Sequence, residues 1–391
     1  MSASCPRIRL LIMSGTLAGG GAERFISNLI GNLSLDSFAP SLCLMRSRIE
    51  YSLPTDVPVF NLDHQGPSHL GRTIRRLRNV IEETEPDLIL SNLDWTGQYV
   101  GEALVGSDVQ PIWIARTSNS PDQTFRGLRG KILRMRLSRV YPRADFFIAN
   151  SHGLANRFVQ TFSCARNRIR VIGNPVDIEG IHRLALDANV DSKPKGKPTL
   201  IWYGRFYPQK RLDILLDAFH KIRACRSAHL LICGSDGPLK TWVARRIRRL
   251  KLTNSTTQLP FQRNPFPLVR QADLALSTSD YEGLSNSVLE AQSLGVPVVA
   301  TRCEFGNSEI VADNETGLLT ERGDANAVAE AAVKLLNDPE LRAVMRSQAL
   351  KRTRQLFDTP IIMRQWEHLF HEVGAMTISG RPQRNARTRA A

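Results

Sequence analysis

Short apolar runs rich in β-branched residues alternate with segments of helical periodicity along most of the 391-residue chain. This alternation is typical of parallel β-sheets with helices on both faces, because two parallel strands are joined through a crossover helix. The sequence therefore predicts an α/β protein. The runs expected to form strands are residues 8–14, 41–45, 57–61, 88–91, 112–116, 146–150 and 169–172 in the first half, and residues 199–203, 230–233, 257–259, 274–277, 296–300 and 317–319 in the second.

Between the two groups of strands lies a stretch with little periodicity, residues 174–198, which carries three prolines and several charges. Such a composition suits a hinge between two domains. A last periodic segment follows Asp358 and Thr359 and has Pro360 at a position that favours a helix start. The expected organisation is an N-terminal domain at residues 1–180, a linker at 181–198, a C-terminal domain at 199–359, a final helix at about 360–374 and a basic, disordered tail at 375–391.

The composition fits a globular protein of a reducing compartment. Hydrophobic residues make up 42% and charged residues 23% of the chain, and the six cysteines are scattered without a C-x-x-C spacing. We therefore expect reduced thiols and a cytoplasmic location rather than a disulfide framework or a zinc site. No apolar run reaches the roughly 18 residues that a membrane-spanning helix needs, and the short first run fits a strand better than a signal peptide.

The chain carries a formal net charge of +15, and its basic residues are clustered. The densest cluster lies at residues 125–143, where apolar residues are interleaved with cations and no acidic residue occurs. This pattern predicts an amphipathic helix that docks on an anionic membrane surface, where each cation contributes about 1 kcal/mol; a solvated helix face is the alternative. No nucleic-acid-binding motif accompanies the charge, so nucleic acid is not an expected partner. The residues expected to dock are Arg126, Arg129, Lys131, Arg134, Arg136 and Arg139.

Two carboxylates, Glu282 and Glu290, stand eight residues apart between the expected strands at residues 274–277 and 296–300. The pattern predicts a loop that leads into a helix, where free backbone N–H groups and the helix dipole favour anions. Carboxylates at such a place suit the hydroxyl groups of a ligand whose anion binds the backbone, with Glu282 near a sugar and Glu290 near a ribose. The segment thus indicates a nucleotide-sugar site, with a solvent-facing acidic helix start as the alternative.

Three turns rich in glycine or cations follow expected strands. The first, residues 15–24, lacks the Lys-Ser/Thr of a P-loop and a clean G-x-G-x-x-G pattern, so neither a nucleoside triphosphate nor a nicotinamide cofactor is favoured. It could admit a diphosphate or a sugar close to the backbone, or only pack a helix on the sheet. The second carries Arg205 and Lys210, which together can neutralise a diphosphate. The third, at Gly234, is a structural turn or lies beside the nucleotide.

The sequence resembles glycosyltransferase family 4 from about residue 8 to residue 373, most specifically in its C-terminal half. Enzymes of that family are retaining, use nucleotide sugars and have the GT-B fold, in which two Rossmann-like domains face a central cleft. The motifs that carry the resemblance are Gly20-Gly21-Ala22-Glu23, Gly204-Arg205 with Lys210, Gly234 with Gly237-Pro238, Glu282-Gly283-Leu284 with Asn286, Leu289-Glu290-Ala291, and Gly295 with Pro297-Val298.

The resemblance implies a role for most of these residues. Arg205 and Lys210 would bind the diphosphate and stabilise the departing nucleotide, and Glu282 would contact hydroxyls of the donor sugar, so these three are the expected catalytic residues. Glu23 would lie near the acceptor, the last helix would pack back on the first domain, and neither a metal nor another cofactor would be needed. The further residues expected to bind the donor, a uridine diphosphate (UDP) sugar, are Gly20, Gly21, Gly204, Gly234, Phe261, Gln262, Gly283, Leu284, Ser285 and Glu290.

The chain departs from the family pattern at one position. Many members have a histidine beside the donor sugar, soon after the strand that is expected to end here at Arg116, but this chain continues with Thr117, Ser118 and Asn119. We expect Ser118 or Asn119 to take that contact. The expected reaction is a front-face attack in which preorganised cations stabilise the leaving group and the donor phosphate takes the proton. A covalent intermediate on Glu282 is the less favoured alternative.

These observations predict a retaining glycosyltransferase that moves a hexose or an N-acetylhexosamine from UDP to a hydroxyl of a glycan or of a polyprenyl-diphosphate-linked acceptor. Together with the basic segment, they favour a role in the synthesis of cell-surface polysaccharide, lipopolysaccharide or glycolipid at the cytoplasmic face of the membrane. The alternatives are a UDP-sugar epimerase of the same fold, which the missing histidine disfavours, and a non-enzymatic protein that binds polyanions or membranes.

Overall fold

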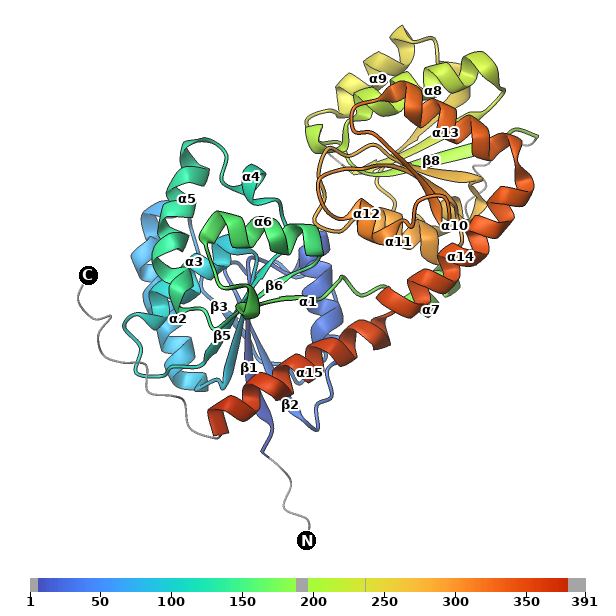
Figure 1. Cartoon of the computed structure of the whole chain (residues 1–391). Helices are drawn as coiled ribbons and strands as arrows, with labels where there is room; N and C mark the ends of the chain where they lie inside the picture. Colours follow the sequence, from blue (N-terminus) through green and yellow to red (C-terminus); the bar gives the residue numbers. More distant parts are fainter. Residues whose placement is uncertain (1–5, 188–195, 236, 379–391) are drawn as a thin grey trace. The chain divides into compact units, whose positions relative to one another are not determined.

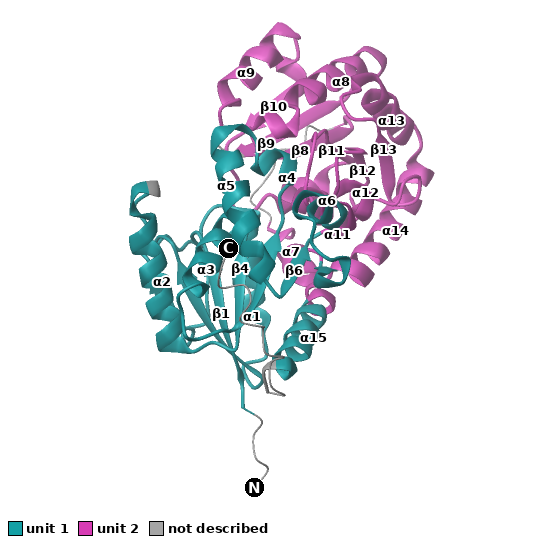
Figure 2. Ribbon diagram, turned by 60° about the vertical axis from the view of Figure 1, so that its left-hand side comes forward, with its two compact units in different colours: residues 1–150, 155–172, 363–391 teal, residues 151–154, 173–362 magenta. Residues whose placement is uncertain are grey.

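The computed structural model of the chain describes residues 6–187, 196–235 and 237–378. The contacts within it divide the chain into two compact units (Figures 1 and 2). Each unit is an α/β domain with its own sheet. Unit 1 comprises the described residues of Met1–Asn150, Ala155–Ile172 and Met363–Ala391, and unit 2 comprises those of Ser151–Leu154 and Gly173–Ile362.

Unit 1 is built on a parallel sheet that, within the described residues, has seven strands in the order β3-β2-β1-β4-β5-β6-β7. The strand order reverses between β1 and β4, and open α/β sheets place ligands at the carboxyl ends of the two strands at such a reversal. The strands are β1 (Ile8–Ser14), β2 (Phe38–Leu44), β3 (Val59–Asn61), β4 (Leu88–Asn92), β5 (Ile112–Thr117), β6 (Phe146–Ala149) and β7 (Ile169–Val171); the α-helices are α1 (Gly21–Asn32), α2 (Leu70–Thr84), α3 (Asp94–Leu104), α4 (Pro121–Thr124), α5 (Gly127–Val140) and α6 (His152–Phe162), the last of which begins in unit 2.

Unit 2 repeats the design with a parallel sheet whose described strands follow the order β10-β9-β8-β11-β12-β13. Its strand order reverses between β8 and β11. The strands are β8 (Thr199–Arg205), β9 (His229–Ser235), β10 (Thr256–Leu259), β11 (Leu274–Ser277), β12 (Val298–Thr301) and β13 (Gly317–Thr320); the α-helices are α7 (Ile178–Leu184), α8 (Leu212–Cys225), α9 (Lys240–Arg249), α10 (Phe266–Gln271), α11 (Asn286–Ser293), α12 (Asn307–Ile310), α13 (Ala325–Asn337) and α14 (Pro339–Phe357), followed by α15 (Thr359–Ile378), which continues into unit 1.

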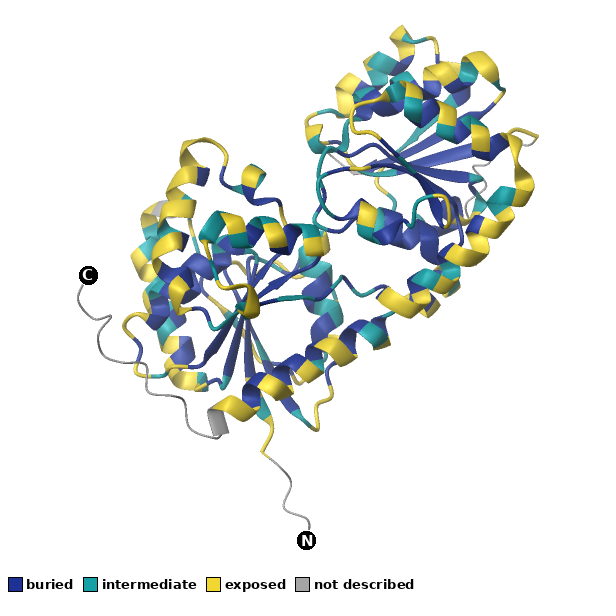
Figure 3. Ribbon diagram, viewed as in Figure 1, coloured by how far each residue is buried: buried dark blue, intermediate teal, exposed yellow. Residues whose placement is uncertain are grey.

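Each expected strand corresponds to an observed strand, and the prediction of two Rossmann-like α/β domains is confirmed. The strands form because their residues can be buried on both sides of a sheet, and Figure 3 shows the strands of both units as largely buried. In β8, Leu200 and Trp202 pack with α8, α9 and α13, while Ile201 packs with α7, α10 and α11 on the opposite face. Successive side chains of a strand point to opposite faces, so one short run anchors both helical layers.

The end of the chain links the two units covalently through α15. From Met363 onward α15 belongs to unit 1, where the Trp366 ring lies 5.4 Å from the ring of Phe25 and the Phe370 ring 5.9 Å from that of Phe38. Helix α7 takes up the first part of the expected linker, and residues 188–195 of that linker lie outside the described residues, as do residues 379–391 of the expected tail. Among the described helices none has the length and apolarity needed to cross a bilayer.

Candidate active site

The site in unit 2 is built on the two strands at which the order of the sheet reverses. Strands β8 and β11 are hydrogen-bonded neighbours, and each leads from its carboxyl end into a loop. The loop after β8 carries Lys210, and the loop after β11 carries Glu282. The reversal brings these two loops together, although the residues are 72 positions apart in the sequence.

Lys210 and Glu282 form a nearly buried ion pair. The Lys210 Nζ donates to Glu282 Oε1 at 2.6 Å, and the two side chains are 14% and 9% exposed. The hydroxyl of Ser279 donates to the same oxygen at 2.7 Å, and the amide of Gln209 donates to Glu282 Oε2 at 3.3 Å. These three donors hold the buried carboxylate in one orientation, because hydrogen bonds from a charged or polar donor are strong in a site with little water.

Backbone contacts between the two loops fix the position of Lys210. The hydroxyl of Thr278 donates to the carbonyl oxygens of Lys210 and Arg211 at 3.0 and 3.1 Å, and the Asp280 N–H donates to the carbonyl oxygen of Gln209 at 2.9 Å. Arg211, with a φ of 45°, lies in the left-handed region, and its guanidinium forms an ion pair with Asp280 at 2.9 Å. The strained residue is therefore held by an ion pair, and the ammonium next to it is preorganised.

Arg205 lies at the end of β8, in the same loop region as Lys210. Its side chain is exposed, with the guanidinium carbon 5.1 Å from the ring centroid of Tyr207. An exposed guanidinium stacked on a ring can pair with two oxygens of an anion without first leaving a buried partner. Arg205 and Lys210 thus offer one accessible and one preorganised cation. Gly204 precedes Arg205 in β8.

Helix α11 starts at Asn286, four residues after Glu282. Ser285 is its N-cap and is buried like Leu284, while Gly283 is half-buried; Glu290 lies in its second turn and is 6% exposed. The helix carries no acidic side chain in its first turn, so its free N–H groups and dipole favour an anion there.

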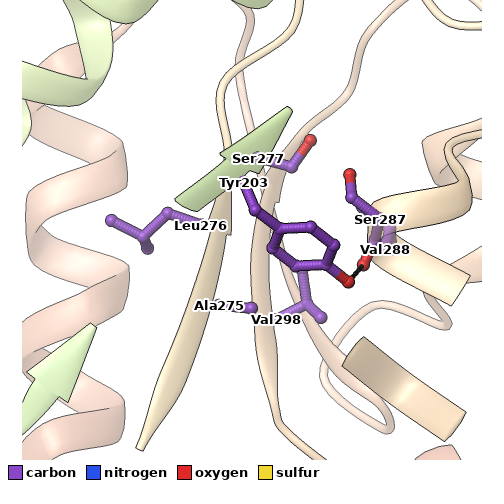
Figure 4. A pocket seen from close by; sticks show the side chains of 7 residues that line it. All are labelled: Tyr203, Ala275, Leu276, Ser277, Ser287, Val288 and Val298. Carbon is purple, nitrogen blue, oxygen red and sulfur yellow. Dashed lines mark hydrogen bonds between the residues drawn. The ribbon is translucent and has the colours of Figure 1, made fainter. Parts of the chain in front are cut away.

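Tyr203 of β8 ties this helix to the sheet. Its hydroxyl donates to the backbone oxygen of Ser287 at 2.5 Å, as the dashed line in Figure 4 marks. Tyr203, Ser277 and Ser287 are among the residues that line a pocket of about 10 Å³, which has room for about one water molecule. The first turn of α11 is thus bound to β8 by a side chain, which keeps the helix start at a fixed distance from Arg205.

The expected contacts to the base and the third glycine turn lie farther along the sheet. Phe261 and Gln262 follow β10, the edge strand two positions from β8; Phe261 is 65% exposed, and the Gln262 amide donates to the carbonyl oxygen of Pro260 at 3.1 Å. Gly234 lies in β9 and pairs with Gly204 of the neighbouring strand β8. A Cβ added to Gly234 would lie 2.0 Å from the ring of Phe206. The close approach of this ring is sufficient to require glycine at position 234, whether or not the residue also contacts a nucleotide.

Replacing Gly234 by alanine is expected to lower the free energy of unfolding by about 1–3 kcal/mol, because the new methyl group overlaps the buried Phe206 ring. Denaturant unfolding followed by fluorescence measures it. The matched control is Gly31→Ala in α1, where no atom lies within 4 Å of the added methyl group, so a stabilisation of about 0.5–1 kcal/mol is expected. Equal midpoints for Gly234→Ala and the unchanged protein would contradict the packing requirement.

The remaining predicted residues belong to unit 1. Gly20 is the N-cap of α1, Gly21 its first residue, and Glu23 lies in its first turn, so all three stand at the carboxyl end of β1. Ser118 and Asn119 follow β5, which β4 separates from β1; Ser118 is half-buried and Asn119 is exposed. The strand reversal between β1 and β4 places these loops along the edge of the sheet where ligands bind.

Sequence reasoning missed a set of buried polar residues at this edge of unit 1. Asp94 accepts hydrogen bonds from the hydroxyls of Thr117 at 3.0 Å and Tyr141 at 2.8 Å, and burial raises the pKa of its carboxyl to about 6. Arg116, only 2% exposed, donates to Asn92 Oδ1 at 2.7 Å. A cation at the end of an otherwise apolar strand was the one sequence signal for this set.

In unit 2, sequence reasoning missed the residues that hold the ion pair. Gln209 and Ser279 donate to Glu282, and Thr278 fixes the backbone at Lys210. Each lies within four residues of a predicted site residue, but a polar residue in a loop is common, so nothing singled them out. Among the described residues, no group of three or more His, Cys, Asp or Glu side chains could hold a metal ion. That the reaction needs no metal stays a prediction.

Two family models match the chain. "Glycosyl transferases group 1" matches residues 186–352, and "Glycosyltransferase Family 4" matches residues 19–179. Among curated proteins, the N-acetylgalactosamine-N,N'-diacetylbacillosaminyl-diphospho-undecaprenol 4-alpha-N-acetylgalactosaminyltransferase of Campylobacter jejuni is 28% identical over 364 residues, which cover 88% of this chain and 95% of that protein.

Solved structures agree in fold. The Anabaena protein HepE in complex with UDP and glucose superimposes with a TM-score of 0.77 at 21% identity, covering 93% of this chain and 100% of that one. The apo form of the lipopolysaccharide outer core galactosyltransferase WaaB gives a TM-score of 0.74 at 18% identity, covering 93% and 99%. The two family models and the Campylobacter relative favour a transferase over the epimerase and scaffold alternatives. The chain belongs to glycosyltransferase family 4 and is a glycosyltransferase of the GT-B fold.

Proposed function

We propose that this glycosyltransferase moves a sugar from UDP to a hydroxyl of a lipid-linked or lipopolysaccharide glycan, with retention of the anomeric configuration and without a metal. The observation that carries the proposal is the buried Lys210–Glu282 ion pair beside the start of α11, a site suited to a diphosphate attached to a polyol. The names of relatives supply the substrate class: the Campylobacter enzyme acts on a diphospho-undecaprenol glycan, and HepE binds UDP and glucose.

Each part of the site has a chemical task in this reaction. Lys210, Arg205 and the free N–H groups of α11 stabilise the charge that develops on the diphosphate as its bond to the anomeric carbon breaks and the electron pair leaves with UDP. Glu282 accepts hydrogen bonds from hydroxyls of the donor sugar, and Glu290 from those of the ribose. The acceptor oxygen attacks the same face of the sugar, and its proton passes to an oxygen of the departing phosphate.

The contacts of Glu282 favour this role over that of a covalent nucleophile. Its carboxylate oxygens already accept hydrogen bonds from Lys210, Ser279 and Gln209, and the ammonium at 2.6 Å draws charge away from them. A nucleophilic carboxylate needs a free oxygen with its charge available for attack. A hydroxyl-binding carboxylate needs only a fixed position, which these donors supply.

The direct test is UDP release from a panel of UDP-sugars, measured with polyprenyl-diphosphate-linked glycans and with truncated lipopolysaccharide as acceptors. NMR of the product gives the anomeric configuration, and parallel reactions with a chelator test metal dependence. Acceptor-dependent UDP release with a retained configuration is the expected result. Release that no acceptor increases, or a product of inverted configuration, would overturn the proposal.

A second part of the proposal is that α5 docks the enzyme on an anionic membrane. Helix α5 buries Gly130, Leu137 and Val140, but Leu128, Ile132 and Met135 are 76%, 40% and 51% exposed. These three stand at i, i+4 and i+7 and form an apolar stripe on the outer face of the helix. The exposed cations Arg126, Arg129, Lys131, Arg134 and Arg139 accompany the stripe. An apolar stripe among cations matches the boundary between acyl chains and anionic headgroups, so a bilayer is the partner that fits both features.

Replacing Arg129, Lys131 and Arg139 together by glutamine is expected to weaken binding to vesicles with anionic lipid about 100-fold, at about 1 kcal/mol for each cation. Vesicle co-sedimentation of the full chain measures the affinity. Replacing Arg245, Arg248 and Arg249 of α9 by glutamine removes the same charge from another helix and is the matched control, expected to keep more of the affinity. Equal losses in both triple variants, or tighter binding to duplex DNA than to vesicles at matched salt, would contradict docking through α5.

A further inference from the structure

The carboxylate of Glu23 is folded back over the start of α1. A Cβ added to Gly20, the N-cap residue, would lie 2.2 Å from Glu23 Oε2, so the carboxylate stands directly over the glycine. Glu23 is the third residue of the helix, the position from which a carboxylate reaches back to the free N–H groups of the first turn. The side chain is half-buried, which leaves part of it accessible to a ligand.

A buried guanidinium lies against the helix that carries this carboxylate. Arg116 of β5 is 2% exposed, and its guanidinium carbon lies 3.8 Å from the ring centroid of Phe25 in α1. Because successive side chains of a strand alternate, Arg116 faces α1 whereas Thr117 faces Asp94 on the other side. Arg116 also donates to Asn92, whose amide donates in turn to the carbonyl oxygen of Ala22 at 3.2 Å. The guanidinium is thus fixed at the start of α1 by Phe25 and by Asn92.

Burial and the carboxylate of Glu23 act in opposite directions on the pKa of Arg116. Burial lowers the pKa of the guanidinium to about 9, and the Coulomb attraction of Glu23 opposes that shift. A pair of this kind adds little net stability compared with apolar residues of the same size, because the buried guanidinium has lost its hydration. It does fix geometry, since the buried guanidinium without a carboxylate nearby would be strongly disfavoured. A fixed carboxylate at the glycine loop repels phosphate and accepts hydrogen bonds from hydroxyl groups.

We propose that Arg116 is a positioning residue that holds the Glu23 carboxylate over Gly20, where Glu23 binds a hydroxyl of the sugar acceptor; this rests on the proposed glycosyl transfer. Arg116 itself touches no substrate. The ligand of Glu23 is a neutral polyol, and the diphosphate of the donor is bound elsewhere, by the cations of unit 2.

Steady-state kinetics of the full-length enzyme with a UDP-sugar and its lipid-linked acceptor separate effects on acceptor binding from effects on donor binding. Glu23→Gln is expected to raise the acceptor KM about tenfold, the effect of weakening one charged hydrogen bond, with the donor KM within about twofold of the unchanged enzyme. Arg116→Met is expected to raise the acceptor KM in the same way and to leave the donor KM within the same range. Arg116→Lys is expected to restore part of the acceptor affinity. The double variant Glu23→Gln/Arg116→Met is expected to be no worse than either single one, because the residues act as a unit.

Control variants distinguish a specific effect on the acceptor KM from a loss of folding and from a lack of glycosyl transfer. Asp145→Asn is expected to leave the acceptor KM unchanged. It is also an acid-to-amide change, but Asp145 lies at the opposite end of β5, where it accepts a hydrogen bond from the Trp113 N–H. If Arg116→Met does not fold, the double variant, which has no unpaired buried charge, gives the measurement. An unchanged acceptor KM in Glu23→Gln, or a rise in donor KM instead, overturns this inference alone. Absence of any transfer by the unchanged enzyme overturns it together with the proposed function.

Discussion

Alanine at position 210 is expected to lower kcat/KM for the UDP-sugar by about two to three orders of magnitude while the protein stays folded. Lys210 is the preorganised cation of the site, and removal of one preorganised group that stabilises developing charge costs about 10²–10³ in rate. The fold tolerates the change because Glu282 keeps its hydrogen bonds from Ser279 and Gln209. Initial rates of UDP release give the first quantity, and thermal unfolding the second.

The matched control for this variant is Lys221→Ala on the exposed side of α8, in the same unit. It removes the same charge at a distance from the strand reversal, so its rate is expected to stay within about twofold of the unchanged enzyme, as for surface changes in general. If Lys210→Ala turned over as fast as Lys221→Ala, the assignment of the active site to the Lys210–Glu282 pair would fail.

Changing Glu282 to glutamine is expected to separate turnover from nucleotide affinity. The rate falls about 100-fold, because the amide binds the donor sugar hydroxyls less strongly and no longer orients Lys210. The affinity for UDP itself is expected to hold or to increase, since Lys210 no longer shares its charge with a carboxylate at 2.6 Å. Isothermal titration with UDP and initial rates with the UDP-sugar, measured on one preparation, report the two effects.

Two results would contradict this role of Glu282. A parallel loss of UDP affinity and rate would mean that Glu282 serves mainly to hold Lys210 in place. Rescue of Glu282→Ala by azide, with a glycosyl azide as product, would indicate a covalent nucleophile instead. Glu315→Gln, an exposed acid of the same unit, is the control and is expected to change neither quantity.

The sequence predicted the strands of both sheets because their signal is local. A run such as residues 112–115 is apolar and contains two β-branched isoleucines, and that pattern needs no knowledge of its neighbours. Residues 205, 210 and 282 could be named for a similar reason, since a cation or carboxylate within a few residues after such a run lies near the carboxyl end of a strand. Family motifs made these local signals specific.

Contacts between distant residues could not be predicted in the same way. The ammonium of Lys210 reaches Glu282 only because β8 and β11 are neighbours in the sheet, an order that the strands' own sequences do not contain. Helix α5 shows the same limit: its apolar residues were expected to be interleaved with cations, but which of them face solvent depends on what α5 packs against.

Arg116 shows the difference between what the sequence determines and what only the tertiary structure decides. The sequence by itself determined that a cation ends an apolar strand, that glycines precede α1 and that two α/β domains form, since each follows from residue type and short-range spacing. Only the tertiary structure decided that Arg116 turns toward α1 and Glu23, that Lys210 meets Glu282, and that the apolar stripe of α5 faces outward. The physical reason is that burial and ion pairing are set by strand order and helix packing, which depend on the whole chain at once.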